Sequence, residues 1–331
     1  MLKKQKVKLR NFFLIISLFL FYSDSIAENH KRTIRIGSLQ YGSVNWELKL
    51  IKELQLDKKN GFNLKIVELA SKNATAVALQ GSAVDIIVTD WFWVSRQRNE
   101  NRLFTFFPHS MAAGGLIVSK DSDIKTYKDL VGKKIGVAGG QVDKSWLILR
   151  AFYQKKYGKD LKDISKQIFG APPLLNKKIT QKSFDAILTY WPYQAKLLVN
   201  KNFIKIINIT DILRKLDLPN GIPVIGWVFK EEWASKNQDL LMKFLSTSKE
   251  AKKLMLESDE IWEKVRPNMN ADDDDLFISL RDSYREGIPS KDFSNSQIES
   301  SKKLYSILSK MGGKKLVGKA KELSPGTFWI K

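Results

Sequence analysis

Acidic and aromatic residues follow two matching segments that lie one hundred positions apart in the chain. Asp90 and Trp91 come after a run of β-branched residues, and Tyr190 and Trp191 follow a similar run. Both runs have the composition of a short buried strand, and the polar and aromatic residues stand where the next helix begins. A carboxylate among aromatic rings suits a small organic ligand with an amine or a ring, bound by stacking or cation–π contact.

The two segments, 84–93 and 184–193, agree at four positions. The identical pairs are Asp85 and Asp185, Ile87 and Ile187, Thr89 and Thr189, and Trp91 and Trp191. A second pair of segments, 34–38 and 133–137, keeps nearly the same offset. Chance resemblance between strand-to-helix junctions is the alternative explanation. Two matches at one offset favour instead two copies of the same α/β unit. Ligands of open α/β sheets bind beyond the carboxyl ends of the strands, so the two ends are predicted to line opposite walls of one cleft.

A glycine-rich turn joins a predicted strand to a helix at residues 136–145. Its backbone N–H groups and the helix dipole can face a polar ligand. The turn does not match a phosphate-binding loop, because Asp143 stands at the place of the second glycine and would repel phosphate. The dinucleotide fingerprint G-x-G-x-x-G fails as well. The turn therefore predicts contact with a small ligand through backbone amides, Gln141 and Asp143, and a plain helix cap is the alternative.

Further aromatic residues gather near the predicted strand ends. Tyr41 and Trp46 follow the first strand, and Trp227 lies near a strand that returns from the second unit to the first. These rings are candidate walls of the same ligand site. The alternative is ordinary core packing, which we expect for Phe92 and Trp146.

The sequence offers few residues for cysteine or histidine chemistry. The chain has no cysteine, which excludes disulfides, thiolate metal sites, a cysteine nucleophile and a lipid-modified cysteine. His30 and His109 have no partners spaced for a metal or a catalytic triad. Four aspartates at 272–275 are interpreted as the first turn of a helix and not as a calcium loop. We predict no catalytic residues, no metal site and no cofactor, and expect the protein not to be an enzyme.

The first 27 residues have the layout of a secretory signal peptide. Five basic residues precede an apolar run at 12–22, and the segment ends in Ser25-Ile26-Ala27. The run is shorter than the roughly 20 residues that span a bilayer. We expect cleavage near Ala27 and a mature protein that is soluble in the periplasm.

The chain is strongly basic, with a formal net charge of +21, of which +4 lies in the leader. Such a surplus is typical of proteins that bind nucleic acid or anionic membranes. The export signal argues against nucleic acid. The lysines are scattered, and we interpret them as a solvated surface, with a dedicated basic patch as the alternative.

Two βαβαβ units follow the leader, which predicts an α/β protein with two parallel, doubly wound lobes. The first unit has predicted strands at 34–39, 61–69 and 84–89 and helices at 44–54 and 74–80. The second has predicted strands at 134–138, 167–169 and 185–190 and helices at 142–157 and 174–180.

Strand-like segments at 114–118 and 221–229 are predicted to cross between the units as a two-strand hinge. The remaining helices, from residue 237 onward, are expected to pack on the outside of the first lobe. The expected boundaries are 28–115 and 223–331 for the first lobe and 116–222 for the second.

This organisation resembles the periplasmic solute-binding proteins of bacterial ABC importers. The local phrases 84–90, 127–137 and 182–186 match the nitrate/sulfonate/taurine branch, which also includes receptors for thiamine precursors. The resemblance implies a type II periplasmic binding protein, a monomer whose lobes close over a small-molecule ligand, with an ABC permease and its ATPase as partners. The positions that match the family's site are Tyr41, Trp46, Asn73, Asp90, Gln141, Asp143, Tyr190 and Trp191.

One departure from the family concerns the ligand. Sulfonate and taurine receptors commonly carry a hydroxyl-rich turn where this chain has Gly139-Gly140-Gln141-Val142-Asp143. The departure puts a sulfonate ligand in question, although several lysines and the helix N-termini still allow a ligand with a carboxylate or sulfonate group.

Two alternatives to an importer component remain. An enzyme of the pyrimidine-precursor-synthesis type shares the fold, but it depends on histidine and cysteine chemistry that this chain lacks. An exported sensor or accessory protein would bind a ligand without feeding a transporter, and co-purification with a permease would distinguish the two.

Overall fold

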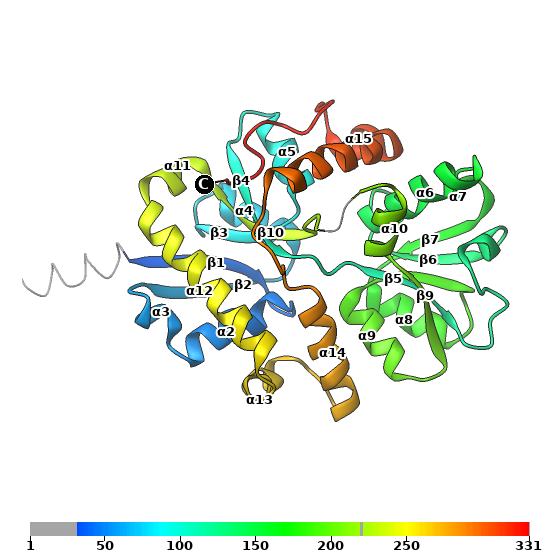
Figure 1. Cartoon of the computed structure of the whole chain (residues 1–331), viewed down its shortest axis with the longest axis horizontal. Helices are drawn as coiled ribbons and strands as arrows, with labels where there is room; N and C mark the ends of the chain where they lie inside the picture. Colours follow the sequence, from blue (N-terminus) through cyan, green and yellow to red (C-terminus); the bar gives the residue numbers. More distant parts are fainter. Residues whose placement is uncertain (1–31, 219–220, 331) are drawn as a thin grey trace, which may run out of the picture.

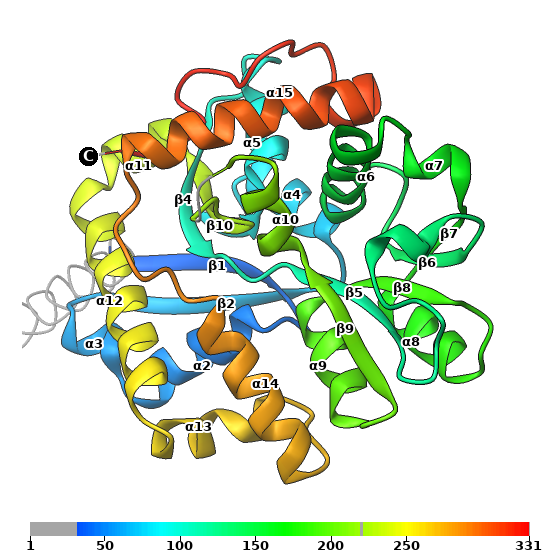
Figure 2. The ribbon, with the colours of Figure 1, turned by 45° about the vertical axis from the view of Figure 1, so that its right-hand side comes forward.

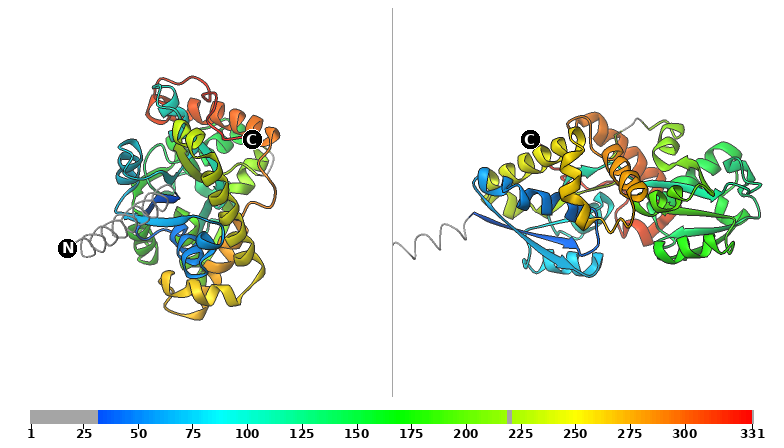
Figure 3. Two further views of the ribbon diagram at one scale, coloured as in Figure 1. Left: turned by 90° about the vertical axis from the view of Figure 1, so that its left-hand side faces the viewer. Right: turned by 90° about the horizontal axis from the view of Figure 1, so that it is seen from below.

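The computed structural model describes residues 32–218 and 221–330, which form two lobes side by side (Figure 1; Figure 3, right). The predicted leader lies outside these residues. Each lobe is built on one five-stranded mixed sheet with helices on both faces. Among the described residues, no helix combines the length and apolar character that crossing a membrane requires. The predicted α/β architecture of two doubly wound lobes is confirmed.

The two sheets repeat one strand order. The first sheet runs β2 (Asn63–Leu69), β1 (Thr33–Leu39), β3 (Ile86–Thr89), β10 (Ile225–Lys230) and β4 (Phe104–Ser110). The second runs β7 (Lys166–Gly170), β6 (Lys134–Ala138), β8 (Ala186–Tyr190), β5 (Gly114–Ser119) and β9 (Phe203–Asn208). In each sheet the first three strands are parallel and the fourth is antiparallel to both neighbours. The repeated segments become β3 and β8, at the same position of the two sheets.

Most of the helices that connect the strands begin directly after a strand, at its carboxyl end. In the first lobe they are α2 (Val44–Glu53), α3 (Leu56–Lys59), α4 (Lys72–Gln80) and α5 (Trp91–Arg98). In the second lobe they are the 3₁₀ turn η1 (Tyr127–Leu130), α6 (Lys144–Tyr157), α7 (Leu161–Ile164), α8 (Pro172–Thr180), α9 (Trp191–Val199) and α10 (Ile209–Lys215). Side chains of Ser71, Asp90 and Asp143 cap α4, α5 and α6, which satisfies backbone N–H groups that a helix start leaves unpaired.

The strands at the predicted hinge belong to the sheets themselves. β5 pairs with β8 and β9 in the second sheet, and β10 pairs with β3 and β4 in the first. Gly114 starts β5 with φ +133°, and a Cβ there would lie 2.1 Å from the carbonyl oxygen of Thr189. Only glycine allows this close approach. The chain changes lobe between β4 and β5, at residues 111–113, so Gly114 and Gly115 lie in the second sheet.

The C-terminal helices cover the first lobe and also reach the second. They are α11 (Glu231–Lys236), α12 (Gln238–Glu257), α13 (Glu260–Val265), the 3₁₀ turn η2 (Arg266–Asn268), α14 (Asp274–Glu286) and α15 (Asn295–Val317). As expected, α12 packs on α2 and α3 of the first lobe. In addition, α14 packs on α9 of the second lobe, and α15 contacts both α5 and α6. Figure 2 shows α15 extending from the first lobe to α6.

Candidate functional site

Asp90 and Lys144 meet between the two lobes. Asp90 follows β3, and its Oδ1 accepts a hydrogen bond from the backbone N–H of Trp93 at 3.1 Å. Its Oδ2 accepts from Nζ of Lys144, the first residue of α6, at 2.8 Å. The side chains are 17% and 35% exposed. This charge-assisted hydrogen bond therefore joins the first lobe to the second in a partly dry environment.

The carboxylate of Asp90 and the ammonium of Lys144 each shift the pKa of the other. Burial favours the neutral acid, but the ammonium groups of Lys144 and Lys72 and the N–H of Trp93 together outweigh it and leave the pKa of Asp90 below its usual value. Burial likewise opposes the charge on Lys144, yet Asp90 raises the pKa of that ammonium above its usual value. Both groups are therefore charged at neutral pH.

A second carboxylate, Asp143, lies next to Lys144 in the chain and caps α6. Its Oδ1 accepts from the backbone N–H groups of Ser145 and Trp146 at 2.9 and 3.2 Å. Its Oδ2 accepts from the phenol of Tyr190 at 3.0 Å, which ties the turn to the end of β8. Burial is the main cause that raises the pKa of Asp143. Burial, with the nearby carboxylates, also raises the pKa of Tyr190 well above its usual range, so the phenol is a neutral hydrogen-bond donor.

Gly139 makes room for this contact. Its φ of +89° lies in the left-handed region, and a Cβ there would lie 2.7 Å from the Tyr190 hydroxyl. A side chain at this position is thus excluded by both backbone and space. The glycine-rich turn positions Asp143 against Tyr190, and the predicted helix cap is present as well.

Lys72 adds a second cation from the first lobe. It begins α4, and its Nζ lies 5.9 Å from the ring centre of Tyr190. This is the outer limit of a cation–π contact, so the interaction is weak. Together, Asp90, Asp143, Lys72, Lys144 and Tyr190 form the group that we call the cleft cluster.

Trp46 and Trp191, both predicted ligand residues, contact each other across the lobes. Their ring centres are 5.9 Å apart at an interplanar angle of 86°. The Trp46 indole N–H donates to the carbonyl of Asn268 at 3.0 Å, and the pair packs with Trp262 and Tyr284. This edge-to-face arrangement is an aromatic wall where α2, α9 and the C-terminal helices meet.

Trp91 and Trp227 lie in the core of the first lobe. Trp91 is 2% exposed, stacks on Phe92 and donates its indole N–H to the carbonyl of Pro223 at 2.9 Å. Trp227 is 1% exposed and donates to the Ser248 hydroxyl at 3.3 Å. The structure does not bring their rings to the cleft cluster, because both side chains fill the space between the sheet and its helices.

The remaining predicted residues lie at exposed positions. Tyr41 follows β1 and is 84% exposed, and Asn73 is exposed in the first turn of α4. Gln141 is exposed, and its Oε1 accepts from Nζ of Lys315 on α15 at 3.4 Å. The structure does not bring these three side chains into the cleft cluster.

Sequence reasoning missed Lys72 and Lys144. Both belong to segments that the sequence singled out, the cap of α4 and the glycine-rich turn. Their charges were grouped with the scattered lysine surplus. Each lysine is the first residue of a helix that follows a strand. That position was the signal by which the sequence could have indicated them as site residues. Within residues 32–218 and 221–330, no group of three His, Asp or Glu side chains is arranged to hold a metal ion.

Comparisons with known proteins agree with this architecture. A family model described as NMT1/THI5 like matches residues 58–260. No curated protein matches the chain in sequence.

Solved structures of binding proteins superpose on most of the chain. The periplasmic aliphatic sulphonate binding protein SsuA of Escherichia coli has a TM-score of 0.71 at 20% identity and covers 90% of this chain and 92% of its own. The alkanesulfonate-binding protein SsuA of Xanthomonas axonopodis pv. citri, bound to MOPS, has a TM-score of 0.68 at 15% identity, over 90% and 98%. The periplasmic nitrate-binding protein NrtA of Synechocystis PCC 6803 has a TM-score of 0.55 at 12% identity, over 77% and 69%. At these identities the likeness establishes the fold of periplasmic binding proteins.

Proposed function

The chain belongs to the NMT1/THI5-like family, and from this premise we propose that it is an exported solute-binding protein. It captures a small organic solute between its lobes and delivers it to an ABC permease with its ATPase. The mature protein acts as a monomer in the periplasm after cleavage near Ala27, and it binds neither nucleic acid nor a cofactor. The binding proteins of the same fold support this proposal.

The observation that carries the proposal is the cleft cluster. Two carboxylates, two ammonium groups and a neutral phenol converge from both lobes, although these charges are costly to remove from water. A ligand with hydrogen-bonding groups on both sides contacts both lobes and thereby favours their closure. Charges of both signs fit an organic solute with an amine or a ring better than a bare inorganic anion.

We assign different roles to the predicted residues. The cleft cluster makes the polar contacts, and Trp46 and Trp191 form one wall. Tyr41, Asn73 and Gln141 are exposed outside the cleft cluster and reach the ligand only after a side-chain movement. Trp91 and Trp227 support the site from the core.

An enzyme on the same fold receives no support from the cluster. The chain has no cysteine, and His109 is 2% exposed and bound to Lys252 inside the first lobe. A histidine there has no access to a ligand.

A thermal-shift screen tests the proposal. Amines, sulfonates, nitrate, pyrimidines and small cofactors are added to the purified protein, and a ligand at about one hundred times its Kd adds roughly 2.7 kcal/mol, a shift of a few degrees. Asp143→Asn and Tyr190→Phe remain folded and lose most of that shift. Asp239→Asn, an exposed substitution on α12, keeps it. A large shift with nitrate alone, or full shifts in both cleft variants, contradicts the proposed ligand class and site.

Export and delivery need their own measurements. N-terminal sequencing of the periplasmic fraction is expected to begin near Glu28, and an intact leader argues against export. Co-purification of a permease with the ligand-loaded protein supports delivery, whereas a bound ligand without any membrane partner supports a sensor.

A further inference from the structure

Lysines gather on the C-terminal helix α15 and in the turn that follows it. Residues 300–321 contain seven lysines and no acidic residue, and no other stretch of this length after the leader has so large a net charge. All seven side chains are exposed. We call this group the lysine face; it consists of Lys302, Lys303, Lys310, Lys314, Lys315, Lys319 and Lys321.

The lysine face points away from the side of α15 that packs on the protein. Leu304, Tyr305 and Leu308 are buried in the main core cluster, whereas Lys303 and Lys310, two helical turns apart, are exposed. No large apolar side chain of residues 300–321 is exposed. The lysine face therefore offers charge without an apolar group that could insert into a bilayer.

Most charges of the lysine face are not neutralised by the protein. Lys302 pairs with Glu299 at 2.7 Å, but the other six lysines have no carboxylate within salt-bridge distance among residues 32–218 and 221–330. By contrast, Lys236 on α11 and Lys243 on α12 each pair with an acidic side chain one turn earlier. The positive potential of the lysine face therefore extends into the solvent, over a screening length of about 10 Å at 0.1 M salt.

Acidic residues gather on the opposite side of the molecule. Residues 257–286, from the end of α12 to the end of α14, contain ten acidic and four basic side chains. Figures 1 and 2 show α13 and α14 at the bottom of the molecule and α15 at the top. A negatively charged surface attracts the side with α15 and repels the side with α14, so it orients the protein as well as binding it.

We propose that the lysine face binds reversibly to anionic lipid headgroups at a membrane surface. Exposed lysines along the outer side of one helix fit a plane of phosphate groups, and each lysine near such a surface adds to the attraction. Residues 300–321 contain no arginine and no exposed aromatic ring, the groups that nucleic-acid sites use for forked hydrogen bonds and base stacking.

Membrane adsorption goes beyond the proposed capture of a solute. It would hold the protein in the plane that contains the proposed permease, and the charges that produce it lie on α15 and not in the cleft cluster. Binding to lipid does not depend on the solute, so it can succeed or fail independently of the proposed function.

Co-sedimentation with vesicles tests the proposal. The purified protein is mixed at about 0.1 M salt with vesicles of phosphatidylglycerol and phosphatidylcholine, or of phosphatidylcholine alone. We expect binding to the anionic vesicles and release at about 1 M salt, where the screening length is about 3 Å. The variant with Lys303→Gln, Lys310→Gln and Lys314→Gln binds about a hundredfold more weakly, because each lysine near the surface contributes about a fivefold factor.

A matched variant separates the lysine face from the net charge of the protein. It carries Lys177→Gln, Lys178→Gln and Lys201→Gln, at three exposed positions of the second lobe that belong to α8 and to the turn before β9. The two triple variants have the same net charge, and the matched variant retains the original affinity within about twofold. Both melt at the temperature of the unmodified protein, because all six lysines are exposed.

Four outcomes overturn the proposal. They are no binding to anionic vesicles, equal binding to both kinds of vesicle, binding that salt does not weaken, and an equal loss in the two triple variants. A duplex oligonucleotide serves as the competing polyanion. If it displaces the protein from the vesicles at an equal concentration of phosphate, the lysine face is a nucleic-acid surface and the assignment to a membrane is wrong.

Discussion

The carboxylate of Asp90 in the first lobe lies 2.8 Å from the ammonium of Lys144 in the second. The two residues are 54 positions apart in the chain. Asp90 caps α5, and Lys144 is the first residue of α6. The lobes also meet at Trp46 and Trp191. The two lobes thus contact each other directly at both pairs, and the proposed ligand inserts among these contacts or replaces them.

Removal of Lys144 is expected to loosen the lobes. Because both partners are partly exposed, the pair contributes about 1 kcal/mol, so Lys144→Ala shifts the open–closed equilibrium about fivefold toward the open form. Small-angle scattering of the ligand-free protein then gives a larger radius of gyration. The control is Lys243→Ala, whose ion pair with Asp239 lies within α12. Equal radii in all three proteins contradict this role.

The Asp90–Lys144 pair is expected to stabilise the folded protein only over a limited range of pH. The pKa of Asp90 is lowered in the folded state, so its contribution is present above its unfolded value and is lost as pH falls through the folded value. The pKa of Lys144 is raised, so its contribution is lost as pH rises through a value above 10.5.

Urea denaturation across pH checks this window. The difference in free energy of unfolding between the unmodified protein and Asp90→Asn is constant around neutral pH and decreases as pH falls through the lowered pKa of folded Asp90. Asparagine retains the helix cap, so the comparison isolates the charge. A difference that grows on acidification rules out this account.

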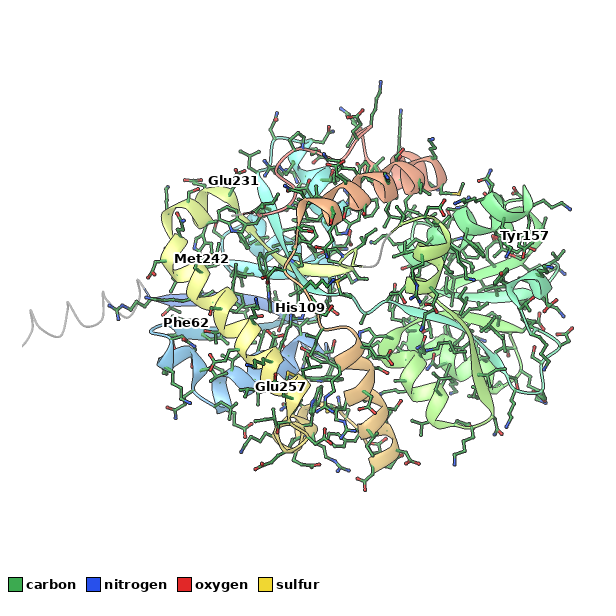
Figure 4. The ribbon with its side chains drawn as sticks, viewed as in Figure 1. Phe62, His109, Tyr157, Glu231, Met242 and Glu257 are labelled. Carbon is green, nitrogen blue, oxygen red and sulfur yellow. The ribbon has the colours of Figure 1, made fainter. Side chains whose placement is uncertain are left out.

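A buried ionic network joins α2, β4, α12 and α14 inside the first lobe. Glu47 is fully buried, accepts from Ser248 at 2.5 Å and from Tyr284 at 3.2 Å, and lies 3.6 Å from Nζ of Lys252. Lys252 also donates to the carbonyl of His109, which Figure 4 labels. Burial raises the pKa of Glu47 and lowers that of Lys252. Glu47→Gln leaves a buried ammonium without its counter-charge and is expected to cost about 3–5 kcal/mol in free energy of unfolding.

Chemical denaturation with two further variants completes this test. Glu257→Gln changes an exposed glutamate on the same helix as Lys252, also labelled in Figure 4, and leaves the free energy of unfolding within about 0.5 kcal/mol. The double variant with Glu47→Gln and Lys252→Met recovers part of the loss, because neither charge is then buried alone. A loss in the double variant equal to the sum of the single losses argues against a coupled pair.

Much of the fold was predictable because its signals are local. The β-branched runs that became β3 and β8, the cap at Ser71 and the four-aspartate helix start at Asp274 depend on neighbours within a few residues. The repeat at one offset then indicated two equivalent sheets. The strands β4 and β9 were missed, since they are sheet-edge strands whose pairing partners, β10 and β5, lie far away in the chain.

The sequence by itself determined the two α/β lobes, the strand ends that face each other and the acidic, aromatic character of those ends. Only the tertiary structure decided which side chains meet there. It paired Asp90 with Lys144, joined Trp46 to Trp191 and buried Trp91 and Trp227 in the core. The physical reason is that the direction of a side chain at a strand end depends on the space left by distant elements, and on the partner that compensates its charge. Neither the space nor the partner is encoded within the local segment.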